Sequence, residues 1–264
     1  YTLHEIPPNG QGIAALIALG ILGHFDLAGL PVDGADAQHL QIEAMKLAFA
    51  DTYRYVSDPA TMEFEAQHLL GDGYLAERAG AIDMGRAQDH EPGEPRAGGT
   101  IYLTTADASG MMVSYIQSNY MGFGSGVVVP GTGISMQNRG AGFSLQPGHP
   151  NEVGPGKRPF HTIIPGFLTR DGKPVMSFGV MGGNMQPQGH AQMVTRIVDY
   201  RQNPQAASDG PRWIVNNDFS VSFEAERFAP GVLDELASRG HRIVESEKAM
   251  FGFGGAQLIW RLDD

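Results

Sequence analysis

The chain has 264 residues and no cysteine, so disulfide bonds and thiolate chemistry are excluded. Basic residues are also few, because 18 lysines and arginines stand against 29 acidic residues and give a net charge of −11. No Lys/Arg cluster interrupts this excess, and a nucleic-acid partner is therefore not expected. No apolar run reaches the length of a membrane span, and no basic-led apolar signal segment follows Tyr1. Composition does not decide between a cytoplasmic and a periplasmic or secreted location.

Metal chemistry has little support either. The chain contains nine histidines, yet none forms an i,i+4 pair with an acid in a zinc-binding pattern. We expect no metal and no cofactor. The 42% hydrophobic and 18% charged residues are typical of a globular protein with one large core or two modest ones.

The most informative feature is a change of composition at Gly98-Gly99-Thr100. Residues 89–97 are acidic and rich in proline, with no large apolar side chain, which predicts an exposed loop. Residues 100–105 are β-branched or aromatic at almost every position, and residues 111–117 are a second strand candidate. The turn signal at 107–110 joins the two runs, so Thr100 is expected to begin the first strand of an antiparallel hairpin.

A threonine after such a loop has a chemical use if the Gly99–Thr100 bond is cut. Thr100 would then carry a hydroxyl nucleophile and a free α-amine on one residue. The amine has a reference pKa of about 7.7–8.0, which suits it to take the hydroxyl proton without a histidine. The structural alternative is a flexible turn that leads into a strand.

Several motifs in the right order resemble the gamma-glutamyltranspeptidase family over nearly the whole chain. Residues 100–143 align without a gap to the small subunit of that family, and Pro7–Gly12 with Ala48–Asp51 resemble the end of its large subunit. The other matching pieces are Pro155-Gly156-Lys157-Arg158-Pro159, Gly179-Val180-Met181-Gly182-Gly183 and Asp209-Gly210-Pro211-Arg212.

The resemblance implies an α+β fold, the four-layer αββα sandwich of N-terminal-nucleophile hydrolases, made as a precursor that cleaves itself before Thr100. Residues 1–99 would be the end of a large-subunit region that closes in a processing loop. Residues 100–264 would be the catalytic small-subunit region, and both would form one domain. The family match assigns the oxyanion donors to Gly182 and Gly183, and assigns Ser118 the hydroxyl that supports the nucleophile.

Departures from the family pattern bear on the substrate. Gly142 replaces the aspartate that would bind the amino group of a γ-glutamyl substrate, and His161-Thr162 replaces a serine pair. Tyr120 replaces an asparagine, and Arg139 replaces an uncharged residue. Asn138 is either a pocket residue or a turn residue. This pattern resembles the acylase branch of the family, which includes cephalosporin and glutaryl acylases.

We therefore expect a small-molecule amide substrate whose acyl group lacks the α-amine and ends in a carboxylate, as glutaryl does. Arg139 would bind that carboxylate, although a structural ion pair explains an arginine here equally well. The rival hypothesis is an unprocessed, non-catalytic homologue that acts as a binding or assembly domain. The chain resembles a part of its relatives, so we expect it to need further chain segments or a homo-oligomer partner.

The remaining pattern predicts secondary structure only coarsely. An apolar helix should follow Gly12, and a second helix with Leu40, Ala44 and Leu47 on one face should be capped by Asp33 or Asp36. Strands are expected at the ranges 126–129, 163–168 and 175–178, and further helices at 71–81, 192–200 and 230–239.

Overall fold

The computed structural model describes residues 1–88, 99–244 and 252–262. The predicted loop at 89–97 lies outside these residues. The helices are α1 (Gly12–Leu22), α2 (Ala35–Tyr55), α3 (Asp72–Gly80), α4 (Met185–Val198), α5 (Pro204–Asp209) and α6 (Val232–Ser238). The strands are β1 (Thr2–His4), β2 (Gly99–Ala106), β3 (Met112–Tyr120), β4 (Gly166–Arg170), β5 (Lys173–Val180), β6 (Trp213–Val215), β7 (Val221–Phe223), β8 (Ile243–Val244) and β9 (Ala256–Trp260).

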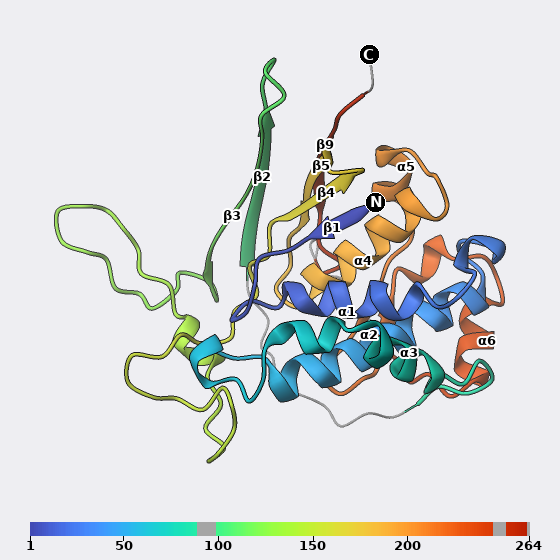
Figure 1. The fold of residues 1–264 in the computed structure, drawn as a ribbon, viewed down its shortest axis with the longest axis horizontal. Coiled ribbons are helices and arrows are strands. Elements are labelled where there is room, and N and C mark those ends of the chain that lie inside the picture. Colours follow the sequence, from blue (N-terminus) through green and yellow to red (C-terminus); the bar gives the residue numbers. More distant parts are fainter. Residues whose placement is uncertain (89–98, 245–251, 263–264) are drawn as a thin grey trace.

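The longer strands form two β layers, with the helices on one side of them. One is an antiparallel sheet in the order β1-β4-β5-β9, and the other is the β2–β3 hairpin, which packs against β5 and β9 (Figure 1). The ring of Tyr102 covers Gly179, where even a Cβ atom would come within 2.3 Å of the ring. Ser114 Oγ donates a hydrogen bond of 2.8 Å to the carbonyl of Gly166. Small and polar side chains therefore let the hairpin approach the sheet closely.

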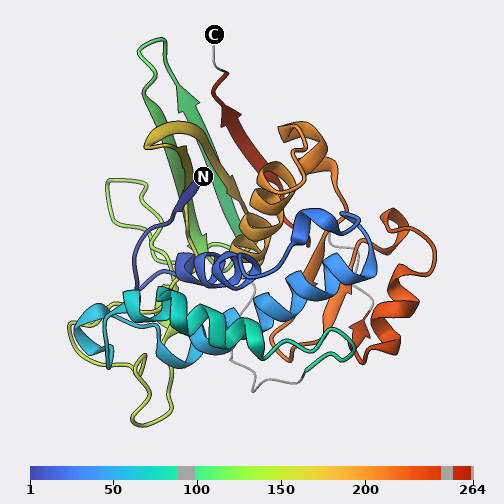
Figure 2. The same ribbon diagram turned by 45° about the vertical axis from the view of Figure 1, so that its right-hand side comes forward.

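Helices cover the other face of the four-stranded sheet. Helix α4 packs on β5, and α1 packs against both α4 and α2, as the turned view in Figure 2 shows. The larger hydrophobic core joins α1 and α2 to the small sheet β6-β7-β8 and includes Trp213. Within the described ranges no helix has the length and apolar character that crossing a membrane requires.

The hairpin predicted around 107–110 is present, and so are the predicted helices, with shifted bounds. The proposed cap of α2 is wrong: Gly34 is the N-cap residue, while Asp33 pairs with Arg196. Asp36 instead lies in the first turn of α2. Helix α4 begins at Met185, one residue after the glycine pair and earlier than the sequence pattern predicted.

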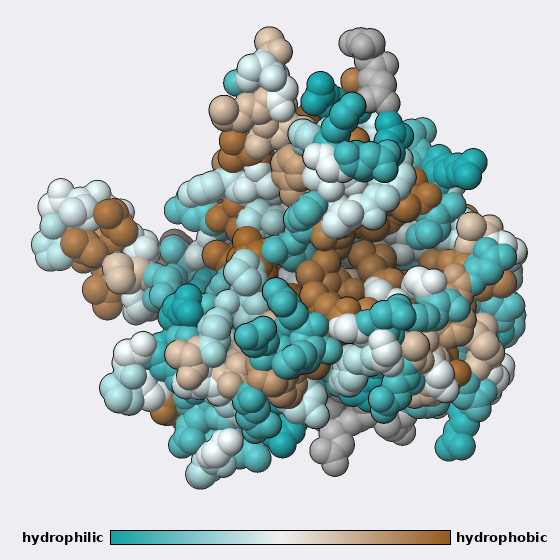
Figure 3. All heavy atoms as spheres, in the orientation of Figure 1, coloured by the Kyte–Doolittle hydropathy of each residue, from teal (hydrophilic) through white to brown (hydrophobic). Residues whose placement is uncertain are grey.

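The strand predicted at 126–129 is also wrong. Residues 121–136 form a projecting arm, and its only ladder contact in the described chain is a bridge between Val128 and Ser135 (Figure 1). Glycines at positive φ, such as Gly126 at 75° and Gly133 at 71°, flank the valine run on both sides. The arm exposes apolar side chains that form the brown patch at the left of Figure 3.

One face of the β2–β3 hairpin is also exposed. Its apolar side chains belong to Ile101, Leu103, Val113 and Tyr115. The described residues include no helical layer over this face. Of the four layers expected, they therefore form two β layers and one helical layer. The chain is an α+β structure in these layers.

Candidate active site

Thr100 lies at an irregular point of the β2–β3 ladder. Gly99 pairs with Tyr120 and Ile101 with Gln117, so the register shifts at Thr100. The Thr100 hydroxyl donates to Ser118 Oγ at 3.4 Å, and Ser118 Oγ also accepts from the backbone N–H of Tyr120 at 2.9 Å. The hairpin therefore brings together the two residues that the sequence assigned to nucleophile and support.

Tyr120 ends β3 in an unusual conformation. It has φ = 75°, a region that bulky residues rarely adopt, and its side chain is buried. The guanidinium of Arg139 lies 5.4 Å from the centre of the Tyr120 ring, a cation–π contact. Burial and this contact hold the strained residue beside Ser118.

Arg139 is a buried cation, with only 8% of its surface exposed. Its Nη1 donates to Thr162 Oγ1 at 3.2 Å, and its Nη2 reaches the carbonyl of Ser118 at 3.5 Å. Within the described ranges no aspartate or glutamate forms an ion pair with it. Burial lowers the pKa of Arg139, yet guanidinium stays protonated in proteins. A buried cation without an anion is a natural site for an anionic ligand.

Gly142 and His161 lie on two segments that run close together. A Cβ atom at Gly142 would lie 2.5 Å from the carbonyl oxygen of Phe160, so only glycine fits there. The backbone of His161 bonds to Asn9 and Gln11. Burial, with the charges of Arg139 and Arg158, lowers the pKa of the His161 imidazole to about 4. His161 is therefore neutral at physiological pH.

The glycine pair lies at the start of α4. Gly182 has φ = 126° and Gly183 has φ = 61°, both accessible mainly to glycine. The fully buried Gln11 donates from Nε2 to the carbonyl of Gly183 at 2.8 Å and to that of Thr162 at 2.7 Å. Gln11 thus joins the glycine pair to the segment that contacts Arg139. No hydrogen bond joins the pair directly to Thr100 in the part of the chain that is described.

Two further side chains make contacts that connect the segments of this site. The side chain of Asn138 accepts the backbone N–H of Met121 at 3.0 Å, which is the turn role left open by the sequence. The sequence does not single out Gln11, because nothing local predicts its contact with Gly183 far along the chain. In the described ranges no group of three histidine, aspartate or glutamate side chains could hold a metal ion.

Comparisons with known proteins find relatives over most of the chain. The chain is 36% identical over 252 residues to the glutathione hydrolase-like YwrD proenzyme of Bacillus subtilis, covering 92% of this chain and 47% of that protein. It is 38% identical over 246 residues to the oxamate amidohydrolase proenzyme of Klebsiella pneumoniae, covering 92% of this chain and 46% of the relative. The crystal structure of cephalosporin acylase from Bacillus halodurans superimposes with a TM-score of 0.90 and 52% identity, covering 98% of this chain and 47% of that one.

The chain thus spans about half the length of these relatives. The family model described as gamma-glutamyltranspeptidase matches residues 1–264. By this match, and by its similarity to two proenzymes named as hydrolases and to a cephalosporin acylase, the chain belongs to the gamma-glutamyltranspeptidase family.

Proposed function

We propose that the protein is an N-terminal-threonine amidohydrolase or acyltransferase that releases Thr100 by self-cleavage. The contact between the Thr100 hydroxyl and Ser118 Oγ, at 3.4 Å, supports this assignment. The backbone N–H of Tyr120 donates to Ser118 Oγ and orients it, so the proposed nucleophile has a hydrogen-bond partner of fixed position. The full-length protein would complete the four-layer sandwich with chain segments, or with a homo-oligomer partner, beyond those described.

Self-cleavage would begin with attack of the Thr100 hydroxyl on the Gly99 carbonyl carbon. A C–O bond forms, the C–N bond between Gly99 and Thr100 breaks, and the hydroxyl proton passes to the leaving nitrogen. Water then hydrolyses the ester, which leaves a carboxylate on Gly99 and restores the hydroxyl. The new α-amine is a base with a pKa near neutrality.

In turnover that amine would take the hydroxyl proton while the oxygen attacks a substrate amide. The tetrahedral intermediate carries an oxyanion, for which the backbone N–H groups at Gly182 and Gly183 are the proposed donors. Each such donor typically contributes about 2.7–4 kcal/mol to transition-state stability. The amine part of the substrate leaves after it has taken the proton from the Thr100 α-amine. Water or a second amine then attacks the ester on Thr100 and releases the acyl group.

The proposed substrate is an amide whose acyl group carries a carboxylate and no α-amine. The observation that carries this choice is the buried guanidinium of Arg139, which touches the same Ser118 that contacts Thr100. A bidentate carboxylate would supply its missing anion. At Gly142 no acid is available for an amino group, and the close Phe160 carbonyl leaves no space for one. The name of one relative, oxamate amidohydrolase, describes a substrate of this kind.

The test uses the full-length protein. Mass spectrometry of the denatured protein should find a chain that begins at Thr100, and Thr100→Ala should remove both cleavage and amide hydrolysis. Glutaryl p-nitroanilide should be hydrolysed faster than γ-glutamyl p-nitroanilide. A lasting intact wild-type chain without activity would support a non-catalytic homologue, and preference for the γ-glutamyl compound would refute the substrate assignment.

A further inference from the structure

Asn151 joins the two segments that border the Arg139 side chain. Its Nδ2 donates to the carbonyl of Gly142 at 2.6 Å, and its Oδ1 accepts the backbone N–H of Phe160 at 3.0 Å. The residue is 6% exposed, so neither bond competes freely with water. One amide group therefore uses both its donor and its acceptor to hold these segments together.

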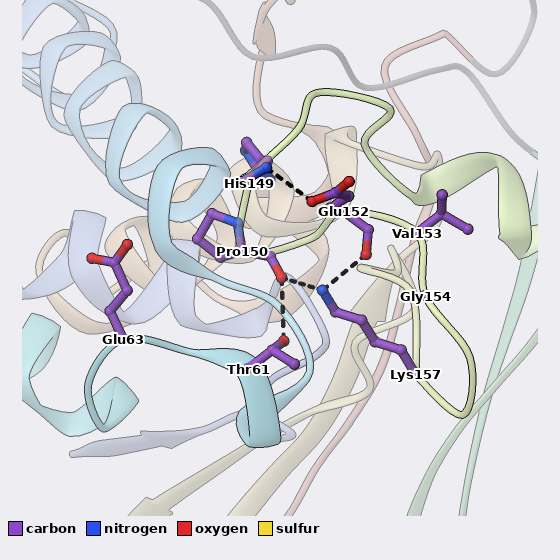
Figure 4. Close-up of a pocket in the computed structure, with 9 residues that line it drawn as sticks. Thr61, Glu63, His149, Pro150, Glu152, Val153, Gly154 and Lys157 are labelled. Atoms are coloured by element: carbon purple, nitrogen blue, oxygen red, sulfur yellow. Dashed lines mark hydrogen bonds between the residues drawn. The ribbon is translucent and has the colours of Figure 1, made fainter.

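The loop that carries Asn151 is itself fixed. The carbonyl of Pro150 accepts hydrogen bonds from Thr61 Oγ1, at 3.2 Å, and from the Lys157 ammonium (Figure 4). Lys157 also donates to the carbonyl of Glu152 at 2.9 Å. These contacts lie beside an open pocket of about 400 Å³ and hold the residues on both sides of Asn151. The amide of Asn151 is thus presented from a rigid support.

The same two segments supply Arg139 and its partner. Arg139 begins the short helical turn Arg139–Gly142, whose last residue is bonded to Asn151. Thr162, which accepts from Arg139 Nη1, follows shortly after Phe160. The separation of these segments decides where the guanidinium lies, and Asn151 sets that separation at a point where Gly142 leaves no space for a Cβ atom.

We propose that Asn151 is a positioning residue for acyl-group specificity: it holds the Gly142 and Phe160 segments together so that Arg139 meets the substrate carboxylate. This inference rests on the proposed function. Asn151 would not touch the substrate, and it would have no part in the release of Thr100.

The isosteric variant Asn151→Asp is the sharpest test, because it replaces the donor to the Gly142 carbonyl with an oxygen that repels it. We would measure kcat/KM of the full-length protein for glutaryl p-nitroanilide and for pentanoyl p-nitroanilide, which has the same chain length without the carboxylate. The ratio of the two values should fall at least about tenfold, through KM of the glutaryl substrate. Pentanoyl hydrolysis and the yield of free Thr100 should stay close to wild type.

Two further variants complete the design. Gly142→Ala should lower the same ratio with Asn151 intact, since its Cβ atom pushes against the Phe160 carbonyl, and it serves if Asn151→Asp does not fold. Asn216→Asp is the matched control, because that asparagine bonds to Ser220 and Ser222 around the β6–β7 turn, away from Arg139. It should leave the ratio unchanged.

The outcomes separate the two proposals. A wild-type preference for glutaryl that survives in both variants overturns the role of Asn151 alone. An equal loss on both substrates also overturns it, because that result describes a merely structural residue. Equal wild-type rates on the two substrates would overturn the carboxylate substrate, and the role of Asn151 with it.

Discussion

Replacing Arg139 by methionine should separate substrate binding from stability. The change removes a buried charge whose desolvation no acid among the described residues offsets, a penalty of several kcal/mol. It also removes the bond to Thr162, the longer contact with Ser118 and the cation–π contact with Tyr120, together about 2–4 kcal/mol. These terms are similar in size, so the free energy of unfolding should change by less than about 2 kcal/mol.

The same change should be severe for a carboxylate substrate. Loss of the charge partner of a desolvated ion costs about 2–5 kcal/mol, so kcat/KM for glutaryl p-nitroanilide should fall by roughly 30-fold to several thousand-fold. The pentanoyl compound lacks the carboxylate and should lose much less. The assays are initial rates on both anilides and urea unfolding of the same preparations.

A surface arginine provides the control. Arg242 is exposed and pairs with Asp218, so Arg242→Met should change neither the rates nor the unfolding midpoint appreciably. An equal loss on both anilides after Arg139→Met, or a loss of stability far above 2 kcal/mol, would refute the view that Arg139 is kept for an anionic ligand.

Three other changes test the surrounding structure. Lys46→Met should lower the free energy of unfolding by about 3–5 kcal/mol, because the buried Glu43 carboxylate, 2.8 Å from the ammonium, loses its charge partner. Urea titrations should show that Glu43→Gln in the same chain recovers most of the loss. Folding lowers the pKa of the His161 imidazole from 6.5 to about 4, so the unfolded chain binds a proton more readily than the folded one. The free energy of unfolding of the wild type should therefore fall by up to about 3 kcal/mol as the pH drops from 6.5 to 4. His161→Gln should flatten that pH dependence, and a variant with an unchanged slope would contradict it. Gly179→Ala should lower stability by about 1–3 kcal/mol in thermal unfolding, since its Cβ atom would overlap the ring of Tyr102, and an unchanged melting temperature would show that the hairpin can move away.

Sequence patterns predicted best what depends on local chemistry. The turn at Asp107–Gly110 fixes the β2–β3 register, and that register brings Thr100 to Ser118. The roles given to Thr100 and Ser118 in catalysis stay predictions. The valine run after Gly126 failed as a strand prediction because β propensity needs a neighbouring strand, and the projecting arm has none in the described structure beyond its own bridge.

Contacts between distant segments could not be predicted from the sequence. Gln11 meets Gly183, and Asn151 meets Phe160, through backbone groups that leave no signal in residue type. From the sequence, Arg139 could equally bind a substrate carboxylate or form a structural ion pair, because residue type alone does not distinguish these roles. Its burial without an acidic partner in the described ranges supports the proposed carboxylate-binding role, which stays a prediction.

Strand β1 has a consequence for the product of the proposed scission. It supplies the edge of the sheet whose other strands all follow Thr100, and α1 and α2 share a core with Trp213. Cutting the backbone before Thr100 would therefore break none of these contacts. The hydrophobic core between residues 1–99 and the rest of the chain would become the interface between two subunits. The two polypeptides should stay together through purification and separate only when the whole fold melts.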